Sequence, residues 1–275
     1  MKHTKAGIFV IIVSFFCYCQ SNNTIETENK TSVPIENKLS YLIEDVKSYP
    51  DSLKLYQTLI DTLANRKLFL DAANWADAAL ERDQQNSVAW LLVKGDLLRI
   101  AKDYDGAIEA YRQYLKFFPN DQQILLNLAN TLAEKGDPRT LIVCKQIVEM
   151  YPTAETKINV AFIKGVFYNI TGLYSAARNN LDTAIAGRYT FTEAWMERGF
   201  SFYDQKLYLD AEANYSQLVQ IDASDAEAWY WLAKSQEASD KKVEATKNYE
   251  RAYALDGTLK EAKDAIKRLN ENNRE

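Results

Sequence analysis

Apolar residues recur at helical spacing along most of this 275-residue chain, and short polar segments separate the helical stretches. In residues 39–49, for example, Leu39, Leu42 and Val46 fall on one face of a helix. A similar amphipathic helix is predicted at the other end of the chain, over residues 260–269. The pattern, together with few Gly and Pro residues, favours an all-α fold with one continuous apolar core.

A 34-residue period is most regular in residues 192–259, where Trp195 and Trp229 occupy equivalent positions. The other equivalent pairs are Gly199 and Ala233, Ala211 and Ala245, Tyr215 and Tyr249, Leu218 and Ala252, and Asp222 and Asp256. Small residues allow two helices to cross closely, and aromatic residues fill the space around the crossing. Each unit is therefore expected to be two antiparallel helices, which must stack on neighbouring units to bury their apolar faces.

This order of Trp, small, Ala and aromatic positions resembles the tetratricopeptide repeat family. The resemblance implies a right-handed superhelical solenoid of about six helix-turn-helix repeats within residues 53–259. Capping helices are expected in residues 38–52 and 260–275. The repeats are placed at about 53–86, 88–121, 122–155, 158–191 and in the two units of 192–259. In the third repeat the second helix is expected to be about one residue short, with Leu141 where the family has alanine.

Residues 1–19 have the features of a secretory signal sequence, with a short basic region followed by an apolar segment over residues 6–19. As a helix this segment would span about 21 Å, which is less than the roughly 30 Å hydrocarbon core of a membrane. It ends in a cysteine followed by polar residues, which resembles a bacterial lipoprotein leader and implies lipidation of Cys19. Cys17 is the alternative lipidation position, and simple secretion or an uncleaved anchor are alternative outcomes.

Polarity and charge limit the other possibilities. Residues 20–37 contain mostly polar side chains and one proline, so a flexible tether is expected there. Only one cysteine, Cys144, lies beyond the leader, which excludes an intramolecular disulfide framework, and we expect it to be a small buried side chain. The formal net charge of −5 argues against a nucleic-acid partner, because phosphate binding needs a basic surface.

The sequence carries no recognisable catalytic pattern. The one histidine, His3, lies in the leader, so the remaining chain lacks the usual general base and the commonest metal ligand. Acid pairs such as Asp103 with Asp105, and Asp222 with Asp225, fall at predicted helix starts and turns, where carboxylates satisfy free backbone N–H groups. We therefore expect no enzyme activity, catalytic residue, cofactor, metal or small-molecule substrate.

The family resemblance implies a concave groove, lined by the first helix of each repeat, that binds a protein or peptide. Its groove positions correspond to Leu92, Asp96, Arg99, Leu126, Asn130, Phe162, Val166, Asn169, Met196, Phe200, Tyr203, Tyr230, Lys234 and Glu237. Relatives that bind the C-terminal carboxylate of chaperones use a Lys/Asn clamp. Asn130 matches that asparagine, but Leu126 stands in the place of the lysine, so we expect no clamp.

The C-terminal half of the expected groove is apolar and aromatic, which favours a seat for an amphipathic helix or an extended peptide. The alternative is that these side chains pack between adjacent first helices or under the C-terminal cap. We expect a non-enzymatic scaffold, attached to the cell envelope by an N-terminal lipid and facing the periplasm or the exterior. A soluble or secreted binding module, or an accessory subunit that positions an envelope enzyme, are the alternatives.

Overall fold

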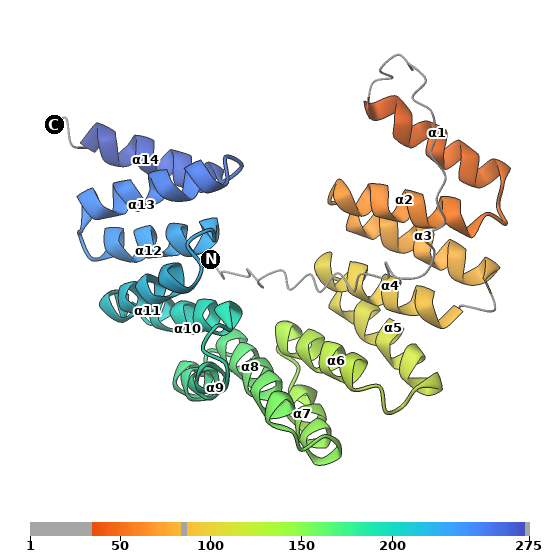
Figure 1. The fold of residues 1–275 in the computed structure, drawn as a ribbon, viewed down its shortest axis with the longest axis horizontal. Helices are drawn as coiled ribbons and strands as arrows, with labels where there is room; N and C mark the ends of the chain where they lie inside the picture. The colour runs from red at the N-terminus through yellow and green to blue at the C-terminus, as the bar shows by residue number, and fades with distance from the viewer. Residues whose placement is uncertain (1–34, 84–86, 273–275) are drawn as a thin grey trace, which may run out of the picture. The chain divides into compact units, whose positions relative to one another are not determined.

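The computed structural model describes residues 35–83 and 87–272, which form 14 α-helices and no strand (Figure 1). The all-α class predicted from the apolar spacing is therefore confirmed. The chain divides into two compact units, residues 1–119 and residues 120–275, called here unit 1 and unit 2. In both units helices follow one another through short connections, so that each packs against its neighbours in the sequence.

Unit 1 contains one preceding helix and two helix pairs. The helices are α1 (Ile35–Ser48), α2 (Leu53–Asn65), α3 (Phe69–Arg82), α4 (Ser87–Ile100) and α5 (Tyr104–Phe117). α1 packs on α2, and contacts then continue from α2 to α3, α4 and α5 in order. This is the stacking expected of repeats that cannot bury an apolar face alone.

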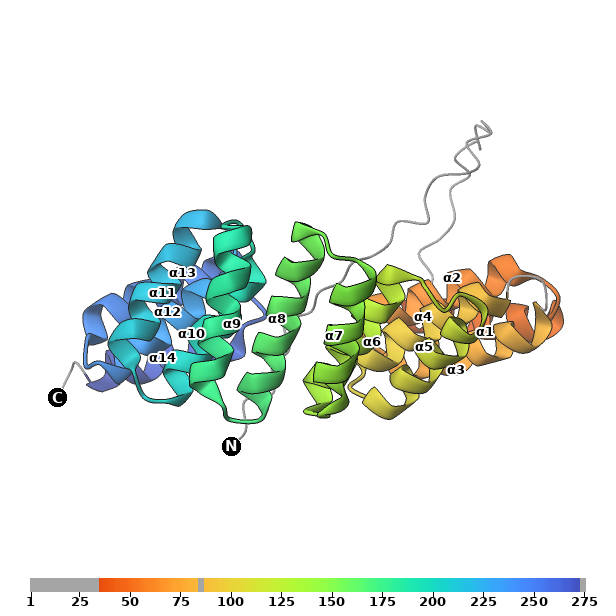
Figure 2. The ribbon, with the colours of Figure 1, turned by 90° about the horizontal axis from the view of Figure 1, so that it is seen from below.

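Unit 2 contains four helix pairs and a final helix. The helices are α6 (Gln122–Lys135), α7 (Arg139–Met150), α8 (Ala154–Ile170), α9 (Tyr174–Gly187), α10 (Thr192–Asp204), α11 (Tyr208–Ile221), α12 (Ala226–Ala238), α13 (Lys242–Leu255) and α14 (Lys260–Asn272). The second helix α9 packs against both α8 and α10 (Figures 1 and 2). The first helices also contact one another, α6 with α8 and α8 with α10. We call the side formed by α6, α8, α10 and α12 the first-helix face.

Two helix boundaries differ from the expectation, and one helix length agrees with it in direction. α8 begins at Ala154 rather than near residue 158, because the Thr153 hydroxyl accepts a hydrogen bond from the Thr156 N–H and caps the helix there. α14 continues to Asn272, past the expected end at residue 269. α7 has 12 residues where α5 and α9 have 14, so it is shortened as predicted, but by two residues rather than about one.

The turn inside every helix pair contains a residue with left-handed backbone at the same repeat position. These residues are Lys67 (φ 62°), Lys102 (φ 65°), Gly136 (φ 74°), Gly172 (φ 77°), Lys206 (φ 61°) and Asp240 (φ 62°). The next N–H closes the preceding helix, as in the 3.0 Å bond from Leu207 N to the Phe202 carbonyl. The repeat register derived from residues 192–259 thus applies to all six pairs.

Small residues lie at the crossings within the pairs, as the sequence predicts. A Cβ added at Gly199 would overlap the ring of Tyr215, and one added at Gly95 would lie 2.7 Å from Cε1 of Tyr111. Both tyrosine side chains are fully buried. Each aromatic ring of the second helix therefore occupies the space that the glycine leaves on the first helix.

The structural roles expected for Cys144 and the acid pairs are confirmed. Cys144 is buried in apolar surroundings, and burial raises the pKa of its thiol to about 12. Asp103 accepts a 3.1 Å hydrogen bond from the Gly106 N–H at the start of α5. Asp225 likewise caps α12, and Asp222 accepts from the Ser224 N–H in the preceding turn.

The leader and most of the expected tether, including Cys17 and Cys19, lie outside the described residues. Within residues 35–83 and 87–272, no helix has the length and the apolar character needed to cross a membrane.

Candidate functional site

The groove candidates are divided between the two units. Leu92, Asp96 and Arg99 lie on α4 of unit 1, and the remaining candidates lie on the first-helix face of unit 2. The structure thus brings together the candidates from residue 126 onward as parts of one unit.

In unit 1, Asp96 is engaged in an internal hydrogen bond. Its carboxylate accepts from the Tyr111 hydroxyl at 2.5 Å, across the crossing that Gly95 opens. Burial raises the pKa of Asp96, while the Tyr111 bond and the charge of Arg99 oppose that shift. Leu92 is half-buried on the same helix. Asp96 therefore helps to hold α4 and α5 together, whatever else it contacts.

At the N-terminal end of the first-helix face, the candidates pack between neighbouring helices. Leu126 and Val166 are 8% and 5% exposed and belong to one apolar cluster. Phe162 is half-buried, and its ring lies 4.8 Å from that of Phe191. Asn130 donates a 2.8 Å hydrogen bond from Nδ2 to Oε1 of Glu134. This end of the face offers little apolar surface to a partner.

Acidic groups gather in the middle of the face around Glu197 of α10. Asn169 of α8 donates from Nδ2 to the Glu197 side chain at 2.9 Å and to its backbone carbonyl at 2.8 Å. The pKa of Glu197 rises to about 7, mainly because its carboxylate is withdrawn from solvent, and the charges of Glu134, Asp204 and Glu227 add to the rise. The bond from Asn169 works against this shift.

Sequence reasoning did not single out Glu197. The equivalent residues of the second, fourth and sixth repeats are Val93, Ile163 and Trp231, all apolar. The first and third repeats have the polar residues Thr58 and Asn127 at this position, so an alignment of the repeats gave no clear signal for a buried carboxylate.

Further along the face, aromatic rings surround Trp231 of α12. The rings of Phe200 and Tyr203 meet it edge-on, with centroids 4.8 and 5.3 Å away, and Tyr230 lies 5.7 Å from it. The Lys234 ammonium lies 4.3 Å from the Trp231 ring, and 5.4 and 5.6 Å from the Tyr203 and Tyr230 rings. Contacts of this kind hold a cation by the negative faces of the rings.

Burial differs among the candidates of α10 and α12. Met196 and Tyr230 are 8% and 9% exposed, whereas Phe200, Tyr203 and Lys234 are half-buried. The second group therefore keeps part of its surface available on the first-helix face, while Met196 packs inside.

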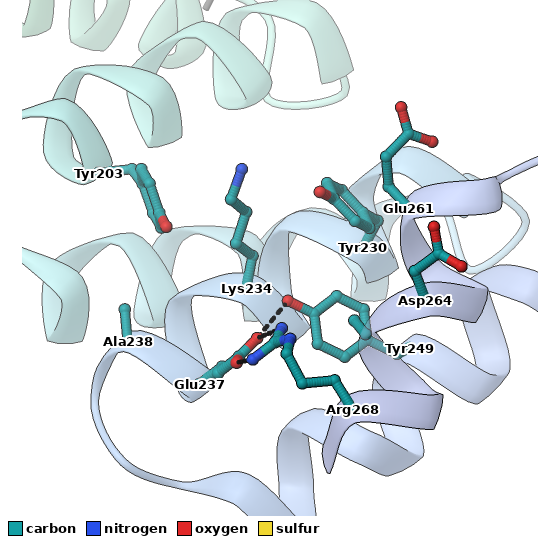
Figure 3. Close-up of a pocket in the computed structure, with 10 residues that line it drawn as sticks. Tyr203, Tyr230, Lys234, Glu237, Ala238, Tyr249, Glu261, Asp264 and Arg268 are labelled. Carbon is teal, nitrogen blue, oxygen red and sulfur yellow. Dashed lines mark hydrogen bonds and ion pairs between the residues drawn. The ribbon is translucent and has the colours of Figure 1, made fainter. Parts of the chain in front are cut away.

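A cavity of about 560 Å³ opens at the C-terminal end of this face, and we call it the C-terminal cavity (Figure 3). It is lined by Tyr203, Tyr230, Lys234, Glu237, Ala238, Tyr249, Glu261, Asp264, Ala265 and Arg268. Arg268 of α14 forms a two-nitrogen ion pair with Glu237 of α12, and the Tyr249 hydroxyl donates to the same carboxylate at 2.9 Å. The bond from Arg268 is the main cause of the lowered pKa of Glu237.

Tyr249, Glu261, Asp264 and Arg268 are cavity residues that the family groove positions do not include. They come from α13 and α14, outside the first helices from which the candidate list was drawn. The C-terminal capping helix thus supplies one wall of the cavity. Its charged residues alone gave no signal, because a capping helix is expected to be charged on its outer side.

The arrangement is suited to noncovalent recognition. Aromatic rings, an ammonium group and carboxylates provide apolar contact and charge at one place. In the described part of the chain, no group of three or more His, Cys, Asp or Glu side chains could hold a metal ion.

Comparison with known proteins identifies similar sequences and folds. The sequence matches the tetratricopeptide repeat family over residues 58–122, 92–139 and 171–226, which together make up half of the chain. Over 232 residues it is 23% identical to the human "Protein O-mannosyl-transferase TMTC3", covering 79% of this chain and 24% of that protein. The chain therefore spans about a quarter of the length of this relative.

Two solved structures share the fold at low sequence identity. A tetratricopeptide repeat protein from Parabacteroides merdae has a TM-score of 0.65 and 14% identity, covering 84% of this chain and 90% of its own. TTC0263, a thermophilic TPR protein in Thermus thermophilus, has a TM-score of 0.53 and 19% identity, covering 66% and 98%. These likenesses concern the fold alone.

Proposed function

The chain belongs to the tetratricopeptide repeat family, and we propose that it is a protein-interaction scaffold that holds a partner segment on the first-helix face of unit 2. The fold supports a scaffold role. The C-terminal cavity carries the finer proposal, because it combines aromatic rings from α10, α12 and α13, of which that of Tyr203 is half-buried, with charged groups from α12 and α14.

The side chains of this cavity suit a peptide partner. Tyrosine supplies a large contact area at a small cost in side-chain entropy, which is why it is enriched where proteins bind one another. Tyr203 and Lys234 are half-buried, so a partner can contact them without first displacing the helices. An amphipathic segment laid along α12 would place apolar side chains on these rings.

Site-specific photo-crosslinking tests the location of the partner. The full-length protein would carry a photoreactive amino acid at Ala238, an exposed residue of the cavity lining, and be irradiated in its native cells. Ala254 is the matched control, because it is also exposed but lies on α13 outside the lining. We expect a discrete adduct from position 238 and none of that mass from position 254. The same adducts from both positions, or none from position 238, would contradict the proposal.

We further propose that the scaffold is attached to a membrane of the cell envelope by a lipid on Cys19. The apolar segment of residues 6–19, its terminal cysteine and the polar residues 20–37 support this proposal. Intact mass of the protein purified from its native membrane provides the test. A chain that begins at residue 19 and carries acyl groups is expected. An unmodified chain would instead favour a secreted or soluble module, and a chain beginning at Cys17 would move the lipid to that residue.

A further inference from the structure

The C-terminal cavity has walls of different charge. α12 provides Lys234 and Glu237, α14 provides Glu261, Asp264 and Arg268, and Tyr203 of α10 closes a third side (Figure 3). Its volume of about 560 Å³ lies within the range of pockets that enclose small ligands, so it has room for side chains of a bound segment.

The α12 side of the cavity is positive. Lys234 extends between Tyr203 and Tyr230 in Figure 3, with its nitrogen directed away from Glu237. The faces of Tyr203, Tyr230 and Trp231 already hold this ammonium, so a second cation entering there would meet repulsion. The carboxylate of Glu237 is paired with Arg268 and accepts from the Tyr249 hydroxyl, and the charge of Lys234 also lowers its pKa, so two cations act on one carboxylate at this side. An anionic group is therefore the charged group that fits beside Lys234.

The α14 side of the cavity is negative at its rim. Glu261 and Asp264 are exposed and lie beyond Tyr230 from Lys234 in Figure 3. Burial is the main cause of the raised pKa of Tyr230, and the charge of Glu261 adds to the rise. A basic group of a partner would therefore be attracted to this rim, whereas an anionic group would be attracted to the α12 side.

We propose that the C-terminal cavity receives an internal segment of a protein partner that carries an acidic side chain against Lys234, an aromatic or aliphatic side chain against the half-buried ring of Tyr203, and a basic side chain against Glu261 and Asp264. This proposal rests on the proposed scaffold function and adds the chemistry of the partner. Because the two charged walls belong to different helices, the acid and the base come from different residues of the segment.

Titration of the full-length, ¹⁵N-labelled protein with short synthetic peptides tests this chemistry. The probes are N-acetylated and C-amidated Lys-Phe-Glu and Glu-Phe-Lys, with Lys-Phe-Gln and Gln-Phe-Glu as matched peptides that lack one charge. The indole N–H signal of Trp231 reports binding, because its ring contacts Tyr203, Tyr230 and Lys234. We expect saturable shifts with at least one of the doubly charged probes. Removal of either charge should weaken binding about tenfold, as expected for loss of a charge-assisted contact.

Protein variants test the contributions of the two charged walls to binding one at a time. Lys234→Met should weaken binding of the Glu-containing probes about tenfold, whereas Lys267→Met should not, because Lys267 is exposed on α14 outside the lining. Glu261→Gln with Asp264→Asn should weaken the Lys-containing probes and leave binding of Gln-Phe-Glu nearly unchanged, because the substitutions remove the negative wall without adding a positive one. Circular dichroism of each variant verifies that the helices remain folded.

Several results would overturn the proposal. These are the absence of any saturable shift, equal binding of the Gln-substituted probes, and equal effects of Lys234→Met and Lys267→Met. Tighter binding of unamidated Lys-Phe-Ala than of amidated Lys-Phe-Glu would also overturn it, since the carboxylate would then come from a chain terminus. If these charge changes have no effect while crosslinking at Ala238 still captures a partner, the scaffold function stands and the charge assignment fails.

Discussion

Three buried tyrosines at the same repeat position allow the helix-crossing contacts to be tested by removal of one oxygen atom. Tyr111 donates to Asp96, and Tyr249 donates to Glu237. Tyr215 is fully buried, and its hydroxyl has no hydrogen-bond partner among the described residues. The missing partner of the Tyr215 hydroxyl is explained by the first helix of its repeat. Phe200 occupies there the position that Asp96 occupies in the repeat of Tyr111.

Tyr249→Phe and Tyr215→Phe are expected to change the free energy of unfolding differently, because only the Tyr249 hydroxyl has a hydrogen-bond partner. Tyr249→Phe removes a hydrogen bond to a carboxylate, which is worth about 1.5–3 kcal/mol when the acceptor is charged. We expect a loss near the lower end of this range, because Glu237 keeps its ion pair with Arg268. Tyr215→Phe removes a polar group whose burial without a partner costs about 1–3 kcal/mol, so it should leave stability unchanged or raise it by up to about 1 kcal/mol.

The assay is equilibrium urea unfolding of the full-length protein and both variants, followed by tryptophan fluorescence. Tyr215 and Tyr249 both lie in unit 2, so the two substitutions are compared within the same compact unit. Tyr111→Phe repeats the comparison in unit 1 and should also destabilise. A loss of 1 kcal/mol or more in Tyr215→Phe, similar to that in Tyr249→Phe, would refute the reasoning, because it would require a partner for the Tyr215 hydroxyl.

Three other predictions concern backbone conformation, charge and packing. Gly172→Ala should lower stability by about 1 kcal/mol through its left-handed backbone alone, since the new Cβ meets no atom within 4 Å. Lys206→Gly should raise stability by about 0.5–1 kcal/mol, because Lys206 also has left-handed backbone. Thermal unfolding measures both changes. The folded-state pKa of Glu197 is raised to about 7, so its contribution to stability is present below pH 4.5 and is lost as the pH rises through 7. Glu197→Gln should therefore match the parent near pH 4 and be more stable by about 2 kcal/mol at pH 8 in urea unfolding; a difference independent of pH would contradict this assignment. Gly199→Leu should destabilise by about 3 kcal/mol, because its side chain would occupy the space of the Tyr215 ring, and an unchanged melting temperature would contradict the helix crossing.

The helix pairs could be predicted from the sequence because one packing pattern recurs in several of the repeats. The separation of Gly199 and Tyr215 in the sequence indicates where two helices cross. Gly95 and Tyr111 have the same separation and make the same contact in unit 1. Local capping was harder to predict. The hydroxyl of Thr153 starts α8 before the position that the 34-residue period indicates.

The C-terminal cavity could not be derived from the period. Its central ion pair joins Glu237 to Arg268, and Arg268 lies on a helix that follows the last repeat, so the repeat period provides no equivalent position from which to predict the contact. The groove positions of the family identified Tyr203, Lys234 and Glu237, but they did not separate half-buried residues from buried ones such as Met196. Whether a groove residue is buried depends on how neighbouring helices pack, and the repeat pattern does not determine that packing.

Hydrogen exchange of the protein, alone and with its captured partner, tests most directly whether the first-helix face of unit 2 holds that partner. The account predicts slower exchange in residues 226–238 and 260–272, which form α12 and α14 beside the cavity, and unchanged exchange in residues 69–82 of α3. Protection confined to the second helices of unit 2, or to unit 1, would contradict it.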